Sequence, residues 1–139
     1  GHVHTLQGHK GAVTCAAFSP GGDLIITASG DATAKIWKAD GSFVQTLEGH
    51  KDDVQTAAFS PDGTRIITAS HDHTVKVWGA AGKVIETLGD HSTYAFSAAF
   101  SPQGYKIATA SADKSVLIYN TADLKMIRKI KTLGLSDKV

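Results

Sequence analysis

The 139-residue chain lacks several features that mark particular classes of protein. Its single cysteine, Cys15, cannot form an internal disulfide, which excludes a disulfide-stapled scaffold and favours a cytoplasmic or otherwise intracellular location. The longest apolar runs, such as Val13 to Phe18, are far shorter than the roughly 20 residues of a membrane helix. The net charge is only +1, so no field of one sign attracts nucleic acid or membrane. We expect a soluble, globular chain with no nucleic-acid or membrane partner.

Proline is also scarce, and its three residues occupy equivalent places in a repeat with an offset of 41 residues. The hydrophobic share of 42% is enough to form a packed core. The columns that recur are a histidine (His9, His50, His91), a phenylalanine (Phe18, Phe59, Phe100), a Ser-Pro pair, a glycine (Gly22, Gly63, Gly104), a Thr-Ala-Ser triplet and an aspartate (Asp31, Asp72, Asp113).

Within each repeat, the hydrophobic residues alternate with a period of two, which predicts strands. In the first repeat we predict strands at about 12–18, 24–29, 33–38 and 43–47. Between the first two strands of the second repeat, Ser60-Pro61-Asp62-Gly63 suits a type I turn. A second, tighter turn passes through Asp31 and its equivalents. Each unit therefore consists of four short antiparallel strands.

A four-stranded unit of this length, with a Gly-His pair, a Ser-Pro turn, an Asp turn and a strand-ending Trp37 or Trp78, resembles the WD40 repeat. The resemblance implies an all-β fold of three four-stranded antiparallel propeller blades. Three blades form an incomplete ring unless more chain or oligomerisation completes it. We assign residues 1–139 to one partial propeller, with blades at 7–47, 48–88 and 89–131. We expect residues 132–139 to be the start of a further repeat or a tail, and residues 2–6 to be the last strand of a preceding blade.

The third repeat departs most from the pattern. Asp90 replaces the glycine before the histidine, and Tyr119 stands in the tryptophan column. Its last strand, near Lys125 to Lys131, carries a one-residue insertion and a cluster of basic residues. We interpret these lysines as a solvated edge that discourages aggregation. No repeat contains the Trp-Asp dipeptide itself.

The resemblance also implies a hydrogen-bonded network in each blade, which joins a histidine, a threonine, an aspartate and an aromatic residue. The members are His9, Thr27, Asp31 and Trp37; His50, Thr68, Asp72 and Trp78; and His91, Thr109, Asp113 and Tyr119. A half-buried aspartate needs such donors. Because a tyrosine donates only from its ring tip, we expect the third network to be shorter.

The same residue types could be interpreted as a nucleophilic triad. An active site occurs once, however, whereas this combination occurs three times at equal spacing. We therefore predict no enzyme activity, no catalytic residues and no cofactor. His71-Asp72-His73 could be interpreted as a metal site, but histidines around a strand turn point apart and no fourth ligand is evident, so we predict no metal.

Partners of WD40 proteins often dock where the Gly-His loops and Asp turns emerge, on either side of the first strand's opening valine and before the turn aspartate. By column, these positions are Ala12, Thr14 and Gly30; Asp53, Gln55 and His71; and Tyr94, Phe96 and Ala112. Aromatic residues dominate interface hot spots, so the third blade is the strongest candidate. Tyr94 is the better surface candidate, because Phe96 could instead pack inward.

These observations favour a non-catalytic scaffold for protein–protein interaction, as a segment of a longer WD40 propeller. One alternative is a self-assembling fragment that completes a ring as a homo-oligomer through its open blade faces. Another alternative is the propeller domain of a larger enzyme or regulator.

Overall fold

The computed structural model describes residues 3–132, which form strands and turns but no helix. No helix among these residues could therefore cross a membrane. The strands form three four-stranded sheets, each of which follows the chain order. Their bounds are β1 Val13–Phe18, β2 Leu24–Ser29, β3 Ala34–Lys38 and β4 Phe43–Leu47; β5 Val54–Phe59, β6 Arg65–Ser70, β7 Val75–Gly79 and β8 Val84–Leu88; and β9 Ala95–Phe100, β10 Lys106–Ser111, β11 Ser115–Asn120 and β12 Met126–Lys131.

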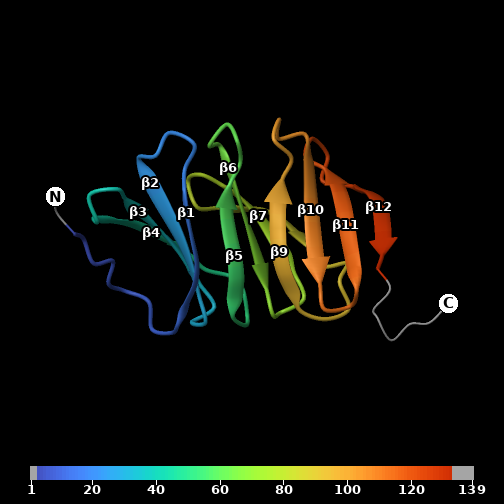
Figure 1. Cartoon of the computed structure of the whole chain (residues 1–139), viewed down its shortest axis with the longest axis horizontal. Helices are drawn as coiled ribbons and strands as arrows, with labels where there is room; N and C mark the ends of the chain where they lie inside the picture. Colours follow the sequence, from blue (N-terminus) through green and yellow to red (C-terminus); the bar gives the residue numbers. More distant parts are fainter. Residues whose placement is uncertain (1–2, 133–139) are drawn as a thin grey trace.

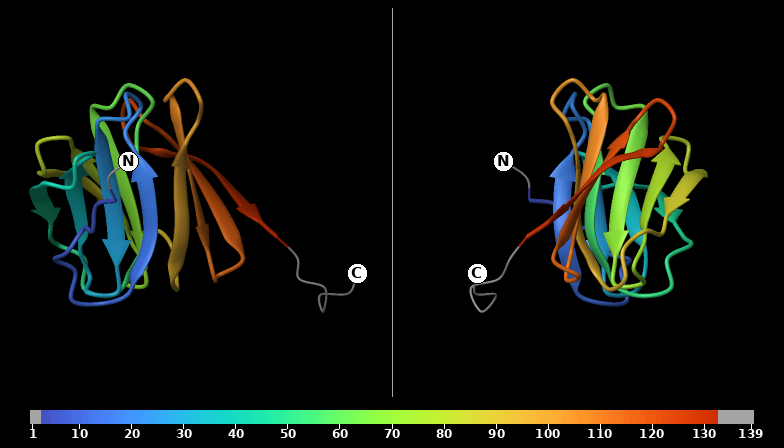
Figure 2. Two further views of the ribbon diagram at one scale, coloured as in Figure 1. Left: turned by 60° about the vertical axis from the view of Figure 1, so that its left-hand side comes forward. Right: turned by 90° about the vertical axis from the view of Figure 1, so that its right-hand side faces the viewer.

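The prediction of three four-stranded antiparallel blades is confirmed: blade 1 is β1–β4, blade 2 is β5–β8 and blade 3 is β9–β12. The strands of blade 1 agree with the prediction to within one residue. The three blades stand side by side without closing a ring (Figure 1). The first strands β1, β5 and β9 are neighbours in space, and the fourth strands form the outer edges, where β12 extends away from the body (Figure 2).

The turns of each blade gather at two opposite edges. At one edge, which we call the Ser-Pro edge, the N–H of Gly63 donates to the carbonyl of Ser60 at 2.9 Å, and Gly63 has a φ of +75°. Blades 1 and 3 repeat this bond. The opposite edge carries the Gly-His loops (8–12, 49–53 and 90–94) and the Asp turns (30–33, 71–74 and 112–115). We call it the His-Asp edge, and it lies at the bottom of Figure 1.

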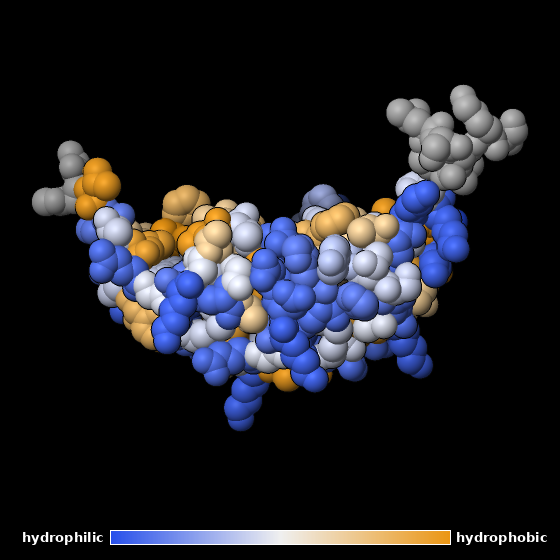
Figure 3. Space-filling view, turned by 90° about the horizontal axis from the view of Figure 1, so that it is seen from below, coloured by the Kyte–Doolittle hydropathy of each residue, from blue (hydrophilic) through white to orange (hydrophobic). Residues whose placement is uncertain are grey.

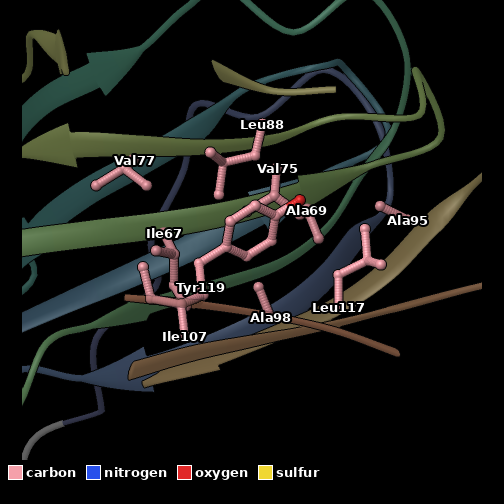
Figure 4. Close-up of a cluster of buried hydrophobic side chains, with 10 residues drawn as sticks. All are labelled: Ile67, Ala69, Val75, Val77, Leu88, Ala95, Ala98, Ile107, Leu117 and Tyr119. Carbon is pink, nitrogen blue, oxygen red and sulfur yellow. The ribbon is translucent and has the colours of Figure 1, made fainter. Parts of the chain in front are cut away.

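The hydrophobic core lies in the interfaces between neighbouring blades, which we call seams. Between blades 1 and 2, Ile26 and Ile36 pack against Val54 and Ile66. Between blades 2 and 3, the ring of Tyr119 lies among apolar side chains of both blades (Figure 4). Since each such seam needs two blade faces, only blade 2 is covered on both sides.

The two end blades each leave a face uncovered. Val13 of β1 is 56% exposed, whereas Val54, its equivalent in β5, is fully buried. All six residues of β12 are exposed. The expectation that residues 2–6 form a strand is wrong for residues 3–6, because no strand lies beside them within the described chain to complete a ladder. Residues 133–139, the expected start of a further repeat, lie outside the described residues.

Candidate functional site

A chain of hydrogen bonds runs through blade 1 from its tryptophan to the Asp turn. The indole N–H of Trp37 donates to Thr27 Oγ1 at 3.0 Å. Thr27 Oγ1 lies 2.7 Å from His9 Nε2, and His9 Nδ1 lies 2.9 Å from an Asp31 carboxylate oxygen. Blade 2 repeats these three contacts through Trp78, Thr68, His50 and Asp72. The fold therefore joins all four residue types of the network in both blades.

The donor and the acceptor of each hydrogen bond can be assigned, because the aspartate at the end of the chain of bonds has no proton to donate. The aspartate can only accept, so we assign the proton of His50 to Nδ1, and the hydroxyl of Thr68 then donates to Nε2. This is also the arrangement of a nucleophilic triad. However, the Thr68 side chain is completely buried and its oxygen also accepts the indole N–H, so a substrate has no approach to it. The threefold occurrence gives the network a structural role.

Each turn aspartate is held by further donors. Asp72 accepts bonds from the backbone N–H and the hydroxyl of Thr74 and from the backbone N–H of Lys51. Burial raises the pKa of Asp72, but the hydrogen bonds from Thr74, His50 and Lys51 outweigh it and lower the pKa to about 2. The pKa values of Asp31 and Asp113 are lowered by the same balance. Burial also lowers the pKa of His50. The turns are therefore built around charged aspartates.

Blade 3 departs from this arrangement, and the expectation that Tyr119 belongs to its network needs correction. His91 contacts Thr109 and Asp113 as in the other blades, at 2.8 and 3.1 Å. The hydroxyl of Tyr119 instead donates to an Asp90 carboxylate oxygen at 2.8 Å. Burial and this bond both raise the pKa of Tyr119. A tyrosine donates only from the tip of its ring, and here the tip meets Asp90, whereas the indole N–H on the side of a tryptophan ring meets the threonine.

The two unusual residues of blade 3 therefore form a pair. In blade 2, a Cβ on Gly49 would lie 3.6 Å from the indole carbon Cη2 of Trp78. In blade 1, a Cβ on Gly8 would lie 3.3 Å from the same atom of Trp37. A side chain in the glycine column would therefore lie against the indole, and both glycines have a positive φ (+157° for Gly8 and +149° for Gly49) that other residues rarely adopt. In blade 3 the ring is that of Tyr119, Asp90 is not among the positive-φ residues, and its carboxylate supplies the acceptor.

In each blade, two of the predicted rim residues are joined by an equivalent backbone hydrogen bond along the His-Asp edge. The N–H of the residue before each turn aspartate donates to the carbonyl of the residue that precedes the first strand. The pairs are Gly30 and Ala12 (2.8 Å), His71 and Asp53 (2.9 Å), and Ala112 and Tyr94 (3.0 Å). The backbone is therefore the same in three blades while the side chains differ.

The side chains from blades 2 and 3 come together at the seam between them. The rings of Tyr94 and His71 stack with centroids 4.5 Å apart, and His73 meets Tyr94 edge to face at 6.3 Å. Tyr94 is nevertheless 45% exposed. The Asp53 carboxylate lies over blade 1, where a Cβ on Gly30 would lie 3.5 Å from it. Tyr94 and Asp53 thus each contact the Asp turn of the preceding blade.

The remaining predicted rim residues lie on the first strands. The hydroxyl of Thr14 donates to the carbonyl of Val54 at 2.6 Å, so it links blades 1 and 2. Phe96 is 45% exposed and does not pack into the core; its carbonyl accepts a bond from Thr56 at 2.7 Å. Gln55 is half-buried on β5. Binding of a partner by these residues stays a prediction.

One cluster on this edge has a composition that could hold a cation, and sequence reasoning missed it. Asp52, Asp53 and His71 place their ligand atoms within 4.8 Å of one another. Asp72 does not belong to it, because its carboxylate binds His50. The sequence signal would have been the adjacent Asp52 and Asp53 in a column pair that carries Gly11 and Ala12 one repeat earlier.

Seen from the His-Asp edge, the molecule is an arc (Figure 3). Hydrophilic residues cover most of this edge, and hydrophobic residues gather along the hollow side of the arc. This is the side of the first strands, where Val13 and Phe96 are exposed. The predicted rim thus borders both a polar edge and a more apolar inner surface.

A family model described as "WD domain, G-beta repeat" matches residues 1–38, 41–79 and 82–120. The second and third matches each begin before the outer strand of one blade and end with the third strand of the next, so repeat and blade are offset by one strand. A curated relative from Arabidopsis thaliana, a U4/U6 small nuclear ribonucleoprotein PRP4-like protein, is 46% identical over 43 residues. That match covers 31% of this chain and 8% of the relative.

Solved structures share the fold at low sequence identity. The structures titled "Structure of U3-55K" and "Crystal structure of RRP9 WD40 repeats" each match with a TM-score of 0.88 and 22% identity. Each match covers 91% of this chain and 41% of the solved chain. The chain thus spans less than half of these longer proteins.

Proposed function

Because the chain belongs to the WD40 repeat family, we propose that it is a non-catalytic scaffold that binds other proteins, as a segment of a longer propeller. The observation that carries the proposal is the His-Asp edge, where one backbone bond recurs in three blades under different side chains. The fold thus leaves the choice of side chain open at Asp53 and Tyr94. An exposed aromatic residue on a rigid strand end is a common interface anchor.

The proposed setting is inside the cell and within a larger assembly. The name of the Arabidopsis relative places that protein in a ribonucleoprotein. We propose protein contacts alone for this chain, since its net charge is +1. The same edge would serve if the chain were the propeller domain of a larger enzyme or regulator.

The test is affinity purification with three forms of the chain: the unchanged sequence, Tyr94→Ala, and Tyr105→Ala as the control. Tyr105 lies at the Ser-Pro edge and is 75% exposed. We expect partners to be retained by the unchanged chain and by Tyr105→Ala. Tyr94→Ala should weaken their binding by about tenfold or more, as for aromatic hot spots. If folded Tyr94→Ala retains every partner, the proposed surface is wrong.

A second candidate function is self-assembly, in which copies of the chain complete a ring head to tail. The open face of blade 1 carries Val13 and Phe18, which are 56% and 66% exposed. The equivalent face of blade 2 carries Val54 and Phe59 and packs into the core against blade 1. The open face therefore has the composition of a seam.

The uncovered face of blade 3 has the matching composition. Val116 and Ile118 of β11 are half-buried. Their column equivalents in blade 2, Val75 and Val77, are fully buried against blade 3. Blade 1 of a second copy could cover Val116 and Ile118 as blade 3 covers Val75 and Val77.

Light scattering of the isolated chain tests this candidate. We expect a mass above that of one chain, reduced to one chain by Phe18→Lys or by Ile118→Lys. Val84→Lys is the control, because Val84 is exposed on the outer strand of the middle blade. A monodisperse monomer at every concentration would rule out self-assembly.

A further inference from the structure

The three repeats carry different side chains at one pair of equivalent positions on the His-Asp edge. The two residues before the first strand are Gly11 and Ala12 in blade 1, Asp52 and Asp53 in blade 2, and Thr93 and Tyr94 in blade 3. Since the backbone bond at this place is the same in all three blades, the fold does not require a carboxylate there. The pair of aspartates is an addition to the scaffold.

The two carboxylates have no cationic partner in the described chain. The His-Asp ion pairs of the three networks use the turn aspartates and leave out Asp52 and Asp53. Asp52 accepts a bond from the backbone N–H of Asp53 at 2.8 Å, and neither carboxylate meets a lysine or arginine side chain. Two unpaired negative charges within 4.8 Å of each other favour the approach of a cation.

An aromatic platform stands beside these carboxylates. The ligand atoms of Asp52 and Asp53 lie within 4.8 Å of His71, and the His71 ring stacks on Tyr94. Phe96 extends the apolar surface along β9, and it is exposed to the same degree as Tyr94. The surface thus offers charge at one end and an exposed ring at the other.

Arginine is the side chain whose chemistry fits both ends. Its planar guanidinium binds carboxylates through two parallel N–H donors, and the same plane stacks on aromatic rings. A lysine ammonium could use the charge but not the stacking geometry. We propose that the surface formed by Asp52, Asp53, His71 and Tyr94 recognises an arginine side chain of a partner protein, with an apolar neighbour of that arginine against Phe96.

This inference rests on the proposed function, because it names the partner chemistry of the same edge. The probe is a phage-displayed library of random heptapeptides, selected on the immobilised chain in the presence of EDTA. We expect the selected peptides to share one arginine flanked by an aliphatic or aromatic residue. Fluorescence anisotropy of a selected peptide should show about tenfold weaker binding after the double change Asp52→Asn and Asp53→Asn.

Two controls make the test specific. Glu48→Gln removes a carboxylate from the same connecting loop, outside the proposed surface, and should leave binding unchanged. Replacing the peptide arginine by lysine should weaken binding by about fivefold, because the bidentate and stacking geometry is lost. Circular dichroism of each variant checks that the fold is intact.

The outcomes separate this inference from the proposed function. Peptides that depend on Tyr94 but lack arginine, or that ignore the two Asp→Asn changes, would overturn the arginine site and leave the docking edge standing. Binding that requires added Zn²⁺ would also overturn it, since Asp52, Asp53 and His71 would then act as metal ligands. Peptides whose binding is unaffected by Tyr94→Ala, or a selection that yields none, would overturn both.

Discussion

Blades 2 and 3 have equivalent strands and turns. They differ where the residue before the network histidine meets the aromatic residue of the third strand, a place that we call the corner. Blade 2 combines Gly49 with Trp78, and the indole donates to the buried Thr68. Blade 3 combines Asp90 with Tyr119, and the hydroxyl donates to Asp90 at the exposed edge. The difference teaches that the glycine and tryptophan columns are in contact and act as one packing unit, in which Asp90 occurs together with the ring of Tyr119.

The largest effect should come from removing the indole of blade 2. Trp78 is buried in the seam with blade 1 and donates to Thr68. We expect Trp78→Ala to lower the free energy of unfolding by about 3–5 kcal/mol, as for other buried aromatic residues. Tyr119→Phe removes only the hydroxyl of blade 3 and should cost about 0.5–1.5 kcal/mol. Urea unfolding measures both, and equal losses would show that the two corners contribute alike.

Exchanging the corner of blade 2 for that of blade 3 sharpens the difference. Gly49→Asp alone should cost about 1–3 kcal/mol, because Gly49 has a φ of +149° that other residues rarely adopt and the new side chain lies against the Trp78 ring. Adding Trp78→Tyr makes room for the carboxylate and supplies a donor. We therefore expect the double variant to be more stable than the sum of the single changes by about 0.5–3 kcal/mol in urea unfolding. Additive losses would contradict the packing unit.

Acid should destabilise the network of blade 2 in two steps. Burial lowers the pKa of His50 below its ordinary 6.5, so unfolding gains a proton and becomes easier as the pH falls below about 6.5. The pKa of Asp72 is about 2 when folded and 3.8 when free, so its contribution is present above pH 4 and is lost as the pH falls towards 2. Melting temperatures between pH 8 and 2 should show both steps. Asp31 and Asp113 contribute to the lower step as well, so Asp72→Asn should make it smaller without removing it. An unchanged curve would refute the contribution of Asp72.

The smallest effect concerns the two seams. The hydroxyl of Thr14 bonds Val54 across the first seam, and that of Thr56 bonds Phe96 across the second. Thr14→Val and Thr56→Val should each cost about 0.5–1.5 kcal/mol in urea unfolding, the usual contribution of one hydrogen bond. Thr64→Val is the control, because its hydroxyl bonds the exposed Asp62 within one turn. A Thr64→Val loss as large as the other two would mean that the seam bonds contribute nothing special.

Local patterns in the sequence were sufficient for most of the fold. Alternation with a period of two located the strands, and the Ser-Pro-Asp-Gly segment located the turn that the Ser60–Gly63 bond closes. Both features depend on residues close together in the chain. The histidine network was implied by the resemblance to the WD40 repeat, and its contacts between histidine and aspartate are present in each blade.

Contacts between residues that differ from the repeat pattern were harder to predict. Asp90 and Tyr119 were each recognised as unusual, yet their bond spans 29 residues and occurs in one blade only. The stacking of Tyr94 on His71 joins two blades and likewise has no counterpart in the repeat. Residues 3–6 match a strand by column, but a strand also needs a neighbour, which a column match does not supply.

The bonds across the seams have a consequence for synthesis of the chain. The side-chain bonds that join neighbouring first strands connect residues 40 or 42 positions apart, which is about one repeat. The loop that must close to dock a new first strand on its predecessor is therefore of nearly constant length, and so is its entropic cost. During translation, every new blade meets a folded predecessor after the same interval, so the propeller can grow from the ribosome one blade at a time without waiting for distant sequence.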